Sequence, residues 1–362
     1  AILFIEQDSC RFVRFVGKKI IRGKNKQIKT IGRRFRALTH SNMHFPKIVF
    51  LDGYTVNPGD LGWKKIEALG TLTVYDRTAP EDVLTRAAEA EIIIVNKTRL
   101  TAETINALPA LRLICVAATG FDVVDIKAAR SRNIPVCNCA GYSTRAVAQM
   151  VMAHILEVTN SVGSYSPRCH EGGWSRSADF CMNEYPQIEL VGRKAAIVGF
   201  GNIGRAVSDV MRPFGLQLHA VTSKPQEALP ADVAKISLEE AFASCDFVSL
   251  NCPLTPDNRQ FVNAALLAKA NPRLTLVNTA RGGLVDDRAV ADALSEGRLF
   301  AYCADVMSQE PPSADNPLLA APRCFLTPHV AWATADARAR IINIIADNIE
   351  AYLAGTPKSV VN

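Results

Sequence analysis

Residues 194–207 read KAAIVGFGNIGRAV, an apolar run that leads into a glycine-rich turn and then into a helical pattern. The run at 195–198 is typical of a strand buried on both faces of a parallel sheet. Gly199 permits a tight turn, Gly201 lets the backbone approach phosphates, and Gly204 lets the following helix pack on the strand. The helix N-terminus adds free N–H groups and a positive dipole. The stretch predicts a dinucleotide site, although such turns also occur without a ligand.

Strand-length apolar runs alternate with helical patterns from residue 46 onward. This alternation is typical of a doubly wound parallel sheet in an α/β protein. Three runs precede the glycine-rich turn, which is too many for the dinucleotide-binding domain alone, so we expect two domains. The predicted strands are 47–51, 91–95, 111–117, 195–199, 217–221, 247–251, 274–278 and 300–305, and the predicted helices are 143–162, 205–214 and 334–354.

The first and last predicted helices are long enough to connect domains. We expect a Rossmann-type NAD(P)-binding domain at 143–332. We expect a smaller, flavodoxin-like α/β substrate domain to be built from 46–142 and 333–362. The loop at 168–187 is long for a connection and holds three aromatic residues, which favours a lid or a subunit arm.

Basic residues are concentrated at the start of the chain. Residues 1–45 hold eleven Lys or Arg against Glu6 and Asp8, a net charge of +9, whereas the whole chain carries +6. The remaining residues therefore carry −3, which argues against a nucleic-acid surface on the folded body. We expect residues 1–45 to be an extension outside the fold. A transit peptide, or a basic arm that touches membrane or nucleic acid, stays open as an alternative.

The cysteines and the hydropathy pattern exclude several classes of protein. Cys137 and Cys139 flank one residue, which suits neither a zinc site nor a redox pair. Cys115, Cys252 and Cys303 lie in apolar runs and are interpreted as small core residues. We expect reduced thiols, a cytoplasmic location and no metal. No apolar run approaches the roughly 20 residues that cross a bilayer, so no membrane partner is expected.

Arg281 follows the predicted strand at 274–278, in the segment NTARGG. Ligands of open α/β sheets bind beyond the carboxyl ends of the strands, so this side chain would point into a crevice. Its guanidinium can hold a carboxylate through two hydrogen bonds, worth about 1.5–3 kcal/mol when charge-assisted. The alternative is an ordinary surface arginine.

His329 follows the short apolar run at 324–326, and Glu310 stands between it and Asp305, which ends another predicted strand. A lone histidine among apolar residues is more often a core residue than a catalyst. Here the glutamate could reach it on a shared sheet edge, and a carboxylate beside an imidazole stabilises the protonated ring. Such a ring donates protons near neutral pH, an effect of roughly 10²–10⁴ in rate.

Together these residues and the glycine-rich turn resemble the D-isomer-specific 2-hydroxyacid dehydrogenase family. The resemblance runs from about Lys47 to Asn362 and rests on the motifs NTARGGLVD, DVMSQEPP and TPHVAWAT. Within the family, LDGYTVNPGDLGW, ATGFDVVD, YSTRAVAQ, WSRSADF and AGTPKSVVN are most similar to D-glycerate dehydrogenases, also called hydroxypyruvate reductases. The resemblance implies reduction of hydroxypyruvate, and of glyoxylate, to D-2-hydroxyacids.

The resemblance also implies roles for the residues around the substrate. Arg281 would bind the substrate carboxylate and carbonyl. His329 would give a proton to the carbonyl oxygen as hydride leaves the nicotinamide, and Glu310 would keep His329 protonated. The other substrate-binding residues that it implies, from the first domain, are Lys97, Thr119 and Gly120.

For the cofactor, the resemblance implies that Asp305 orients the nicotinamide amide. Family members are usually dimers formed through the cofactor domain, so a homodimer with the loop at 168–187 as an arm is expected. The cofactor-binding residues that it implies are Gly199, Gly201, Asn202, Ile203, Gly204, Thr222, Ser223, Lys224, Asn251, Cys252, Pro253, Thr279, Ala280, Arg281 and Asp305.

The sequence departs from the NAD-specific pattern after the strand at 217–221. NAD-specific members usually carry an aspartate where Thr222 stands, and that carboxylate binds the ribose hydroxyls and repels a 2′-phosphate. Here Thr222, Ser223 and Lys224 stand instead, and these groups can receive a phosphate. The pattern favours NADPH or dual use. The alternative is that Thr222 simply bonds the ribose of NADH.

Other functions on the same fold stay open at this point. Formate-specific relatives carry glutamine where Glu310 stands, which counts against formate oxidation, whereas phosphite oxidation is harder to exclude. A nucleotide-sensing protein similar to the C-terminal-binding-protein corepressors is the alternative outside the enzymes. The motifs similar to glycerate dehydrogenase count against it.

Overall fold

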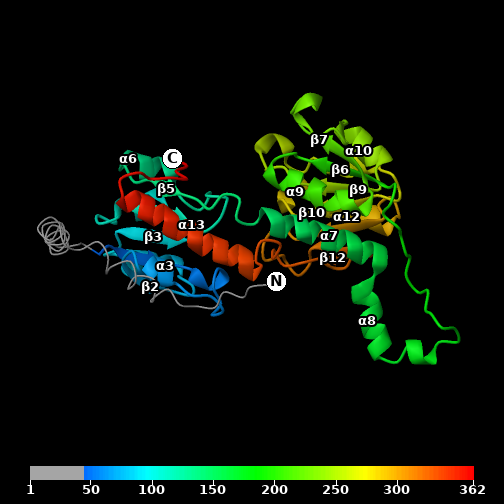
Figure 1. Cartoon of the computed structure of the whole chain (residues 1–362), viewed down its shortest axis with the longest axis horizontal. Coiled ribbons are helices and arrows are strands. Elements are labelled where there is room, and N and C mark those ends of the chain that lie inside the picture. The colour runs from blue at the N-terminus through cyan, green and yellow to red at the C-terminus, as the bar shows by residue number, and fades with distance from the viewer. Residues whose placement is uncertain (1–44) are drawn as a thin grey trace, which may run out of the picture.

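The computed structural model describes residues 45–362, which form two α/β lobes side by side (Figure 1). The predictions for the basic extension therefore fall almost wholly on residues outside the described part. Each lobe is built on its own parallel sheet, so the predicted α/β class with two parallel sheets is confirmed. The proposed domain boundaries at 142/143 and 332/333 stay a prediction.

The small lobe has a five-stranded parallel sheet in the order β2-β1-β3-β4-β5, which is the flavodoxin-like order. Strands β1, β3 and β4 are nearly fully buried, as their unbroken apolar runs predict. Strand β2 is half exposed, and β5 has only two residues. The strands are β1 Lys47–Phe50, β2 Thr71–Val74, β3 Ile92–Val95, β4 Leu113–Val116 and β5 Val136–Cys137, and the helices are α3 Lys64–Glu67, α4 Val83–Ala87, α5 Ala102–Asn106 and α6 Ile126–Ser131.

The large lobe has a seven-stranded parallel sheet in the order β12-β11-β10-β9-β6-β7-β8. Six of these strands follow the Rossmann order, with the glycine-rich turn after the central strand β6. The strands are β6 Lys194–Val198, β7 Gln217–Val221, β8 Val233–Lys235, β9 Phe247–Leu250, β10 Thr275–Asn278, β11 Ala301–Ala304 and β12 Cys324–Leu326, and the helices are α9 Asn202–Met211, α10 Leu238–Ser244, α11 Ala264–Leu267 and α12 Asp287–Ser295.

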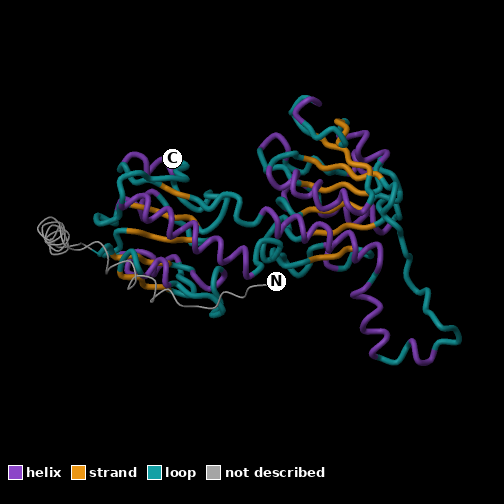
Figure 2. The backbone as a smooth tube through the Cα atoms, in the orientation of Figure 1, coloured by secondary structure: helices purple, strands orange, loops and turns teal. Residues whose placement is uncertain are grey.

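Two long helices lie where the chain passes from one lobe to the other, and both were predicted. Helix α7, Thr144–Asn160, begins in the core of the small lobe with Ala146 and continues into the core of the large lobe with Ile155. Helix α13, Ala335–Leu353, returns to the small lobe and runs beside its sheet (Figure 2). Its buried isoleucines belong to the core of that lobe, and the helix contacts β4. The chain therefore crosses between the lobes twice.

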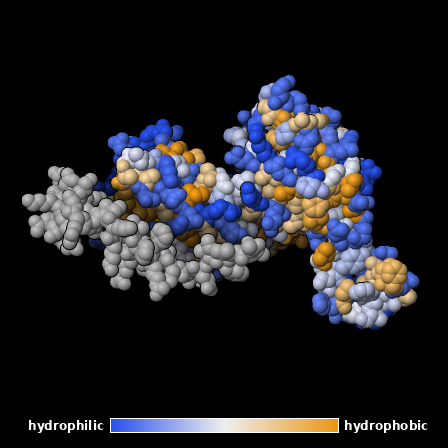
Figure 3. Space-filling model, in the orientation of Figure 1, coloured by the Kyte–Doolittle hydropathy of each residue, from blue (hydrophilic) through white to orange (hydrophobic). Residues whose placement is uncertain are grey.

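An arm projects from the large lobe where a single long helix and a loop were predicted. Ser161 adopts a left-handed backbone, φ +53°, and ends α7, so a separate helix α8 runs from Val162–His170. The chain returns along α8, and Tyr165 packs edge-on against Tyr185 at 4.9 Å between ring centroids. The arm stands clear of both lobes, with apolar surface on it (Figure 3).

Cys115 and Cys303 are buried as predicted, whereas Cys252 is only partly buried, because it lines a cavity beyond the end of β9. All nine cysteines in the described part are free, and Cys115, Cys137, Cys139, Cys245 and Cys303 are buried. Burial raises the pKa of the Cys139 thiol to about 12, which keeps it inert. Within residues 45–362, no cluster of side chains is suited to a metal ion, and no helix is long and apolar enough to cross a membrane.

Candidate functional site

The glycine-rich turn forms the floor of a crevice beyond the carboxyl end of β6. Gly199 has φ +91°, and a Cβ there would lie 2.7 Å from the backbone nitrogen of Cys252. Only glycine fits this position. Gly204 is buried where α9 packs on β6, whereas a Cβ on Gly201 would meet nothing within 4 Å. The crevice is therefore open above Gly201, at the N-terminus of α9, which begins with Asn202 and Ile203.

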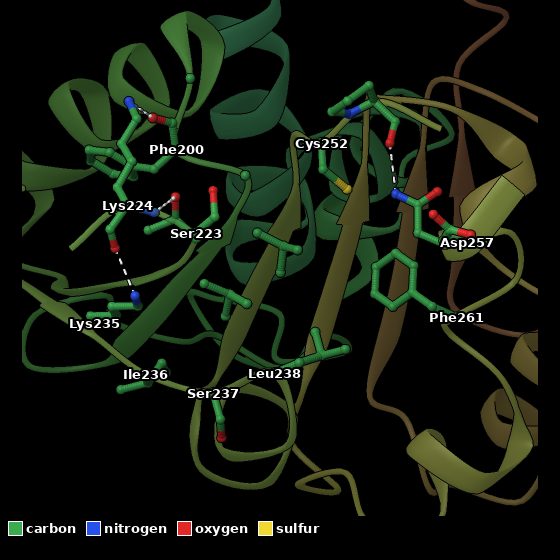
Figure 4. Close-up of a pocket in the computed structure, with 17 residues that line it drawn as sticks. Phe200, Ser223, Lys224, Lys235, Ile236, Ser237, Leu238, Cys252, Asp257 and Phe261 are labelled. Atoms are coloured by element: carbon green, nitrogen blue, oxygen red, sulfur yellow. Dashed lines mark hydrogen bonds between the residues drawn. The ribbon is translucent and has the colours of Figure 1, made fainter. Parts of the chain in front are cut away.

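A cavity of about 770 Å³ continues from this turn toward the ends of β7 and β9 (Figure 4). The predicted cofactor residues Thr222, Ser223 and Lys224 line one side of it, and Cys252 and Pro253 line the other side. The remaining lining residues include Lys235, Ile236, Ser237, Leu238, Asp257, Asn258 and Phe261. The cavity thus brings together seven of the predicted cofactor residues, from the turns after three separate strands, whereas the other eight do not line it. Their role in cofactor binding stays a prediction.

Two lysines form the polar rim of this cavity. The Lys224 ammonium donates a hydrogen bond to the carbonyl of Phe200 at 2.8 Å, and the Lys235 ammonium donates to the carbonyl of Lys224 at 2.7 Å (Figure 4). The backbone N–H of Lys224 donates to Thr222 Oγ1 at 3.3 Å. No carboxylate follows β7 at Thr222, so the charge at this end of the cavity is positive. Asp257 lies on the opposite side.

The start of helix α9 suits the crevice to a dinucleotide by its chemistry as well as by its shape, and two polar residues follow the neighbouring strands β9 and β10. Asn251 Oδ1 and Thr279 Oγ1 are buried and have no hydrogen-bond partner among the described residues. Helix α9 begins at Gly201 with no side-chain cap, so its first N–H groups are free to bind a phosphate. Neither Asn251 nor Thr279 lines the cavity, so the N–H groups of α9 are the observation that points to a phosphate.

Arg281 lies on a loop whose backbone is held by hydrogen bonds to the buried side-chain amide of Asn278. Asn278, the last residue of β10, donates from Nδ2 to the carbonyl of Arg281 at 3.0 Å and accepts from the Ala280 N–H at 3.1 Å. A Cβ on Gly282 would collide with the backbone of Met307, so this loop packs directly on the segment that leads to the glutamate. The exposed guanidinium donates to the carbonyl of Ala280 at 2.8 Å.

The small lobe reaches Arg281 at Gly120. A Cβ on Gly120 would lie 3.4 Å from Arg281 Nη2, so backbone from one lobe faces the guanidinium of the other. The carbonyl of Thr119 accepts a hydrogen bond from Asn138 at 2.7 Å, and its hydroxyl donates to the carbonyl of Cys139 at 3.2 Å. The predicted neighbourhood of Arg281, Thr119 and Gly120 is thus present, and its role in substrate binding stays a prediction.

His329 and Glu310 are in direct contact at the same sheet edge. Nδ1 of His329 lies 2.5 Å from Oε2 of Glu310, and both side chains are about one-third exposed. The backbone N–H of Met307 donates to the other oxygen, Oε1, at 3.0 Å. Desolvation alone would raise the pKa of Glu310. The hydrogen bond and charge of His329, the Met307 N–H and the charge of Lys97 together hold that pKa below its ordinary value.

The turn that carries His329 is held by Asp305. This carboxylate, 1% exposed, accepts hydrogen bonds from the Thr327 hydroxyl at 2.6 Å, from the Val330 N–H at 2.9 Å and from the Ala331 N–H at 2.8 Å. The position of Asp305 at the end of β11 was predicted, whereas its three hydrogen bonds to other residues of the protein were not. Its predicted contact with a nicotinamide amide is not tested by these contacts, because a carboxylate oxygen can accept more than one hydrogen bond.

Two further residues support this site and were not found from the sequence. Asp52, two residues after the end of β1, accepts the backbone N–H groups of Asn96, Lys97 and Thr98 at 2.7, 2.5 and 2.7 Å, and so fixes the loop of the predicted residue Lys97. Its place after an apolar strand was an available signal. His154 lies in α7 with Nε2 3.3 Å from the Thr327 hydroxyl. A single histidine in a helix gives no such signal.

Comparison with known proteins gives consistent results. The model of the NAD binding domain of D-isomer specific 2-hydroxyacid dehydrogenases matches residues 152–331. A hydroxypyruvate reductase of Blautia hydrogenotrophica is 39% identical over 320 residues, which cover 87% of this chain and 99% of that protein. A glycerate dehydrogenase of Methylorubrum extorquens is 35% identical over 318 residues, which cover 87% of this chain and 98% of that protein.

A solved structure supports the architecture of both lobes. An acyclic imino acid reductase in complex with NADPH and D-Arg matches with a TM-score of 0.75 and 26% identity. The match covers 87% of this chain and all of that structure. The arrangement of the two sheets is therefore similar to that of this reductase.

Proposed function

The chain belongs to the D-isomer specific 2-hydroxyacid dehydrogenase family, and from that premise we propose that it reduces hydroxypyruvate and glyoxylate to D-glycerate and glycolate. The observation that carries the proposal is the contact of 2.5 Å between His329 and Glu310, on the sheet edge that also presents Arg281. An acid, its carboxylate partner and a carboxylate-binding guanidinium are the groups that reduction of a 2-keto acid needs.

We propose a separate task for each of these side chains. The Arg281 guanidinium is exposed beside Gly120, where a substrate carboxylate can accept two of its N–H groups. Glu310 occupies Nδ1 of His329, so Nε2 is the ring atom left to deliver a proton to the substrate carbonyl oxygen. The same pair takes the proton back in the oxidation direction. Lys97, on the facing lobe, adds positive charge near this site.

The cofactor-binding residues support a nicotinamide dinucleotide. The turn at Gly199 and Gly201 would hold its pyrophosphate, together with the uncapped N–H groups at the start of α9. A bound nicotinamide supplies the hydride that the protein itself lacks.

We further propose that NADPH is preferred. Thr222 and Ser223 stand where an aspartate would repel a 2′-phosphate, and the ammonium groups of Lys224 and Lys235 lie on the same rim of the cavity. An ammonium has three donors, and the structure uses one of each lysine, so both can still bind a phosphate.

The arm supports a homodimer through the large lobe. It is ordered by its own contacts, among them the Trp174 indole N–H donating to the carbonyl of Phe180 at 2.9 Å, yet Trp174 is 56% and Phe180 91% exposed. A large exposed apolar surface is a mark of a partner site, and a two-fold copy is the default. The free, buried cysteines support a reducing compartment, and we propose the cytoplasm.

A substrate panel with both cofactors tests the proposal. Oxidation of NADPH and NADH is followed with hydroxypyruvate, glyoxylate, pyruvate, phenylpyruvate and no acid, and phosphite is offered with NADP⁺ and NAD⁺. We expect turnover with hydroxypyruvate and glyoxylate to exceed that with phenylpyruvate. Turnover of phosphite alone, or nucleotide binding with no turnover of any acid, would contradict the proposed reaction.

A further inference from the structure

We propose that His154 is a positioning residue that orients the His329 turn through the hydroxyl of Thr327. It lies in helix α7, outside the set of side chains that would meet substrate or cofactor. Its effect reaches His329 along the hydrogen-bonded series His154, Thr327 and Asp305. The inference rests on the proposed function for its catalytic consequence, but the geometry that carries it stands on its own.

The turn at His329 needs an external hold because its backbone is unusual. His329 has φ +54°, in the left-handed region that a residue with a Cβ rarely adopts, and its N–H donates to the carbonyl of Thr327 at 3.0 Å. Such a conformation persists only where the surrounding structure fixes it. Asp305 does so by accepting the N–H groups of Val330 and Ala331 directly after the histidine.

The direction of each hydrogen bond in the series follows from the chemistry of its members. Asp305 as a carboxylate can only accept, so the Thr327 hydroxyl donates its one proton to Oδ1 at 2.6 Å. Toward His154 that hydroxyl must then accept. Nε2 of His154, 3.3 Å away, therefore carries the proton of the neutral ring.

The neutral ring follows from the surroundings of His154. Its side chain is 5% exposed, and burial lowers its pKa, with only Asp305 opposing that shift. The ring therefore has a single N–H, and the structure directs it at Thr327. This bond leaves the hydroxyl one orientation, toward Asp305, and so fixes the carboxylate that holds the His329 turn.

Helix α7 gives the series a rigid base. It packs against β10 and β11 of the large lobe, and the Cys303 thiol contacts the carbonyl of His154 at 3.9 Å. A site held by side chains on packed helices and strands keeps its geometry better than one held by loops alone. Loss of the series would let the His329 ring move relative to Glu310 while leaving the Gly199 crevice intact.

Two pairs of variants test the inference. Thr327→Val keeps the shape of the side chain and removes the hydroxyl, whereas Thr327→Ser returns it. His154→Leu removes the ring N–H, whereas His154→Gln returns a donor near the place of Nε2. Each protein is measured for kcat and KM with hydroxypyruvate, for the Kd of NADPH by fluorescence, and for Tm.

We expect Thr327→Val and His154→Leu to lower kcat by about 10- to 100-fold, the range for a misplaced catalytic group. The Kd of NADPH and the KM should stay within about twofold, and the Ser and Gln variants should recover most of kcat. The double variant Thr327→Val/His154→Leu should lose little more than the worse single one. Equal losses in the Val and Ser variants, or unchanged kcat in Val and Leu, would overturn the inference.

A second measurement does not depend on turnover. The downfield NMR signal of the His329 imidazole N–H proton, assigned by its loss in Glu310→Gln, reports the contact with Glu310. It should weaken in Thr327→Val and His154→Leu and return in the Ser and Gln variants, and an unmoved signal would overturn the inference. If the parent reduces no 2-keto acid, the proposed function fails while this signal still decides on the positioning.

Discussion

Nδ1 of His329 lies 2.5 Å from Oε2 of Glu310, because the two residues follow strands β12 and β11, which are neighbours in the parallel sheet. The glutamate follows β11 and the histidine follows β12, so the register of the sheet brings them together at one edge. Arg281 follows the next strand along, β10. Three consecutive strands of the sheet thus place an acid, its partner and a carboxylate-binding group side by side.

Glu310→Gln should shift the pH dependence of reduction. The parent carboxylate stabilises the protonated imidazole of His329, and the amide does not. Reductase kcat should therefore be lost at a lower pH in the variant than in the parent, as measured by pH–rate profiles with saturating hydroxypyruvate. Glu296→Gln, which removes an exposed carboxylate far from the crevice, is the control. A superimposable profile for Glu310→Gln would remove Glu310 from the mechanism.

The lowered pKa of Glu310 also has a consequence for stability. A carboxyl whose pKa is lower in the folded state stabilises the fold above its unfolded value, about 4.3, and loses this contribution as the pH falls through the folded value. The difference in unfolding midpoint between the parent and Glu310→Gln should be greatest near pH 6 and shrink toward about pH 3. Urea unfolding at each pH measures it. A difference in unfolding midpoint that stays constant between pH 6 and about pH 3 would contradict the ionised state of Glu310.

Arg281→Lys should strongly reduce kcat/KM, although the substitution keeps the positive charge. Lysine presents a point charge where the guanidinium presents two parallel N–H groups, so we expect a loss of about 10- to 100-fold. Steady-state kinetics with hydroxypyruvate measure it, and the Kd of NADPH should change little. Arg298→Lys, on an exposed turn, serves as the control. Activity of Arg281→Lys close to that of the parent would show that the substrate carboxylate binds elsewhere.

The cofactor preference is tested at the rim of the cavity. kcat/KM with NADPH should at least equal that with NADH in the parent, and a tenfold preference for NADH would refute this assignment. Thr222→Asp should reverse the preference, because its carboxylate would repel the 2′-phosphate and bind the ribose. Lys224→Ala and Lys235→Ala should each raise the KM for NADPH more than that for NADH. Lys269→Ala removes an exposed lysine that follows α11 and does not line the cavity, so it should change neither.

The sequence predicted most of the fold because the central strands are continuous apolar runs, as in β3 and β6. It missed four strands: β2, whose exposed and half-buried residues alternate, and β5, β8 and β12, which are only two or three residues long. It also missed the end of α7 at Ser161, where no glycine or proline marks the left-handed residue. Within the site, the sequence motifs predicted Arg281, Glu310 and His329.

The supporting residues were not predictable in this way. His154 and Thr327 are 173 positions apart, and their contact exists only because α7 packs on the sheet. His154 stands in no pattern that periodicity or spacing can identify, and Thr327, although it begins the motif TPHVAWAT, gives no sign in the sequence of this contact. Long-range side-chain hydrogen bonds of this kind depend on the packing of elements, which local sequence does not encode.

The most direct test of the account is the rate of hydroxypyruvate reduction in His329→Gln. The substitution removes the proton donor and keeps a polar side chain, so kcat should fall by about 10²- to 10⁴-fold. The Kd of NADPH should be unchanged, because the crevice at Gly199 is not altered. A variant that keeps kcat within tenfold of the parent would contradict the claim that His329 delivers the proton.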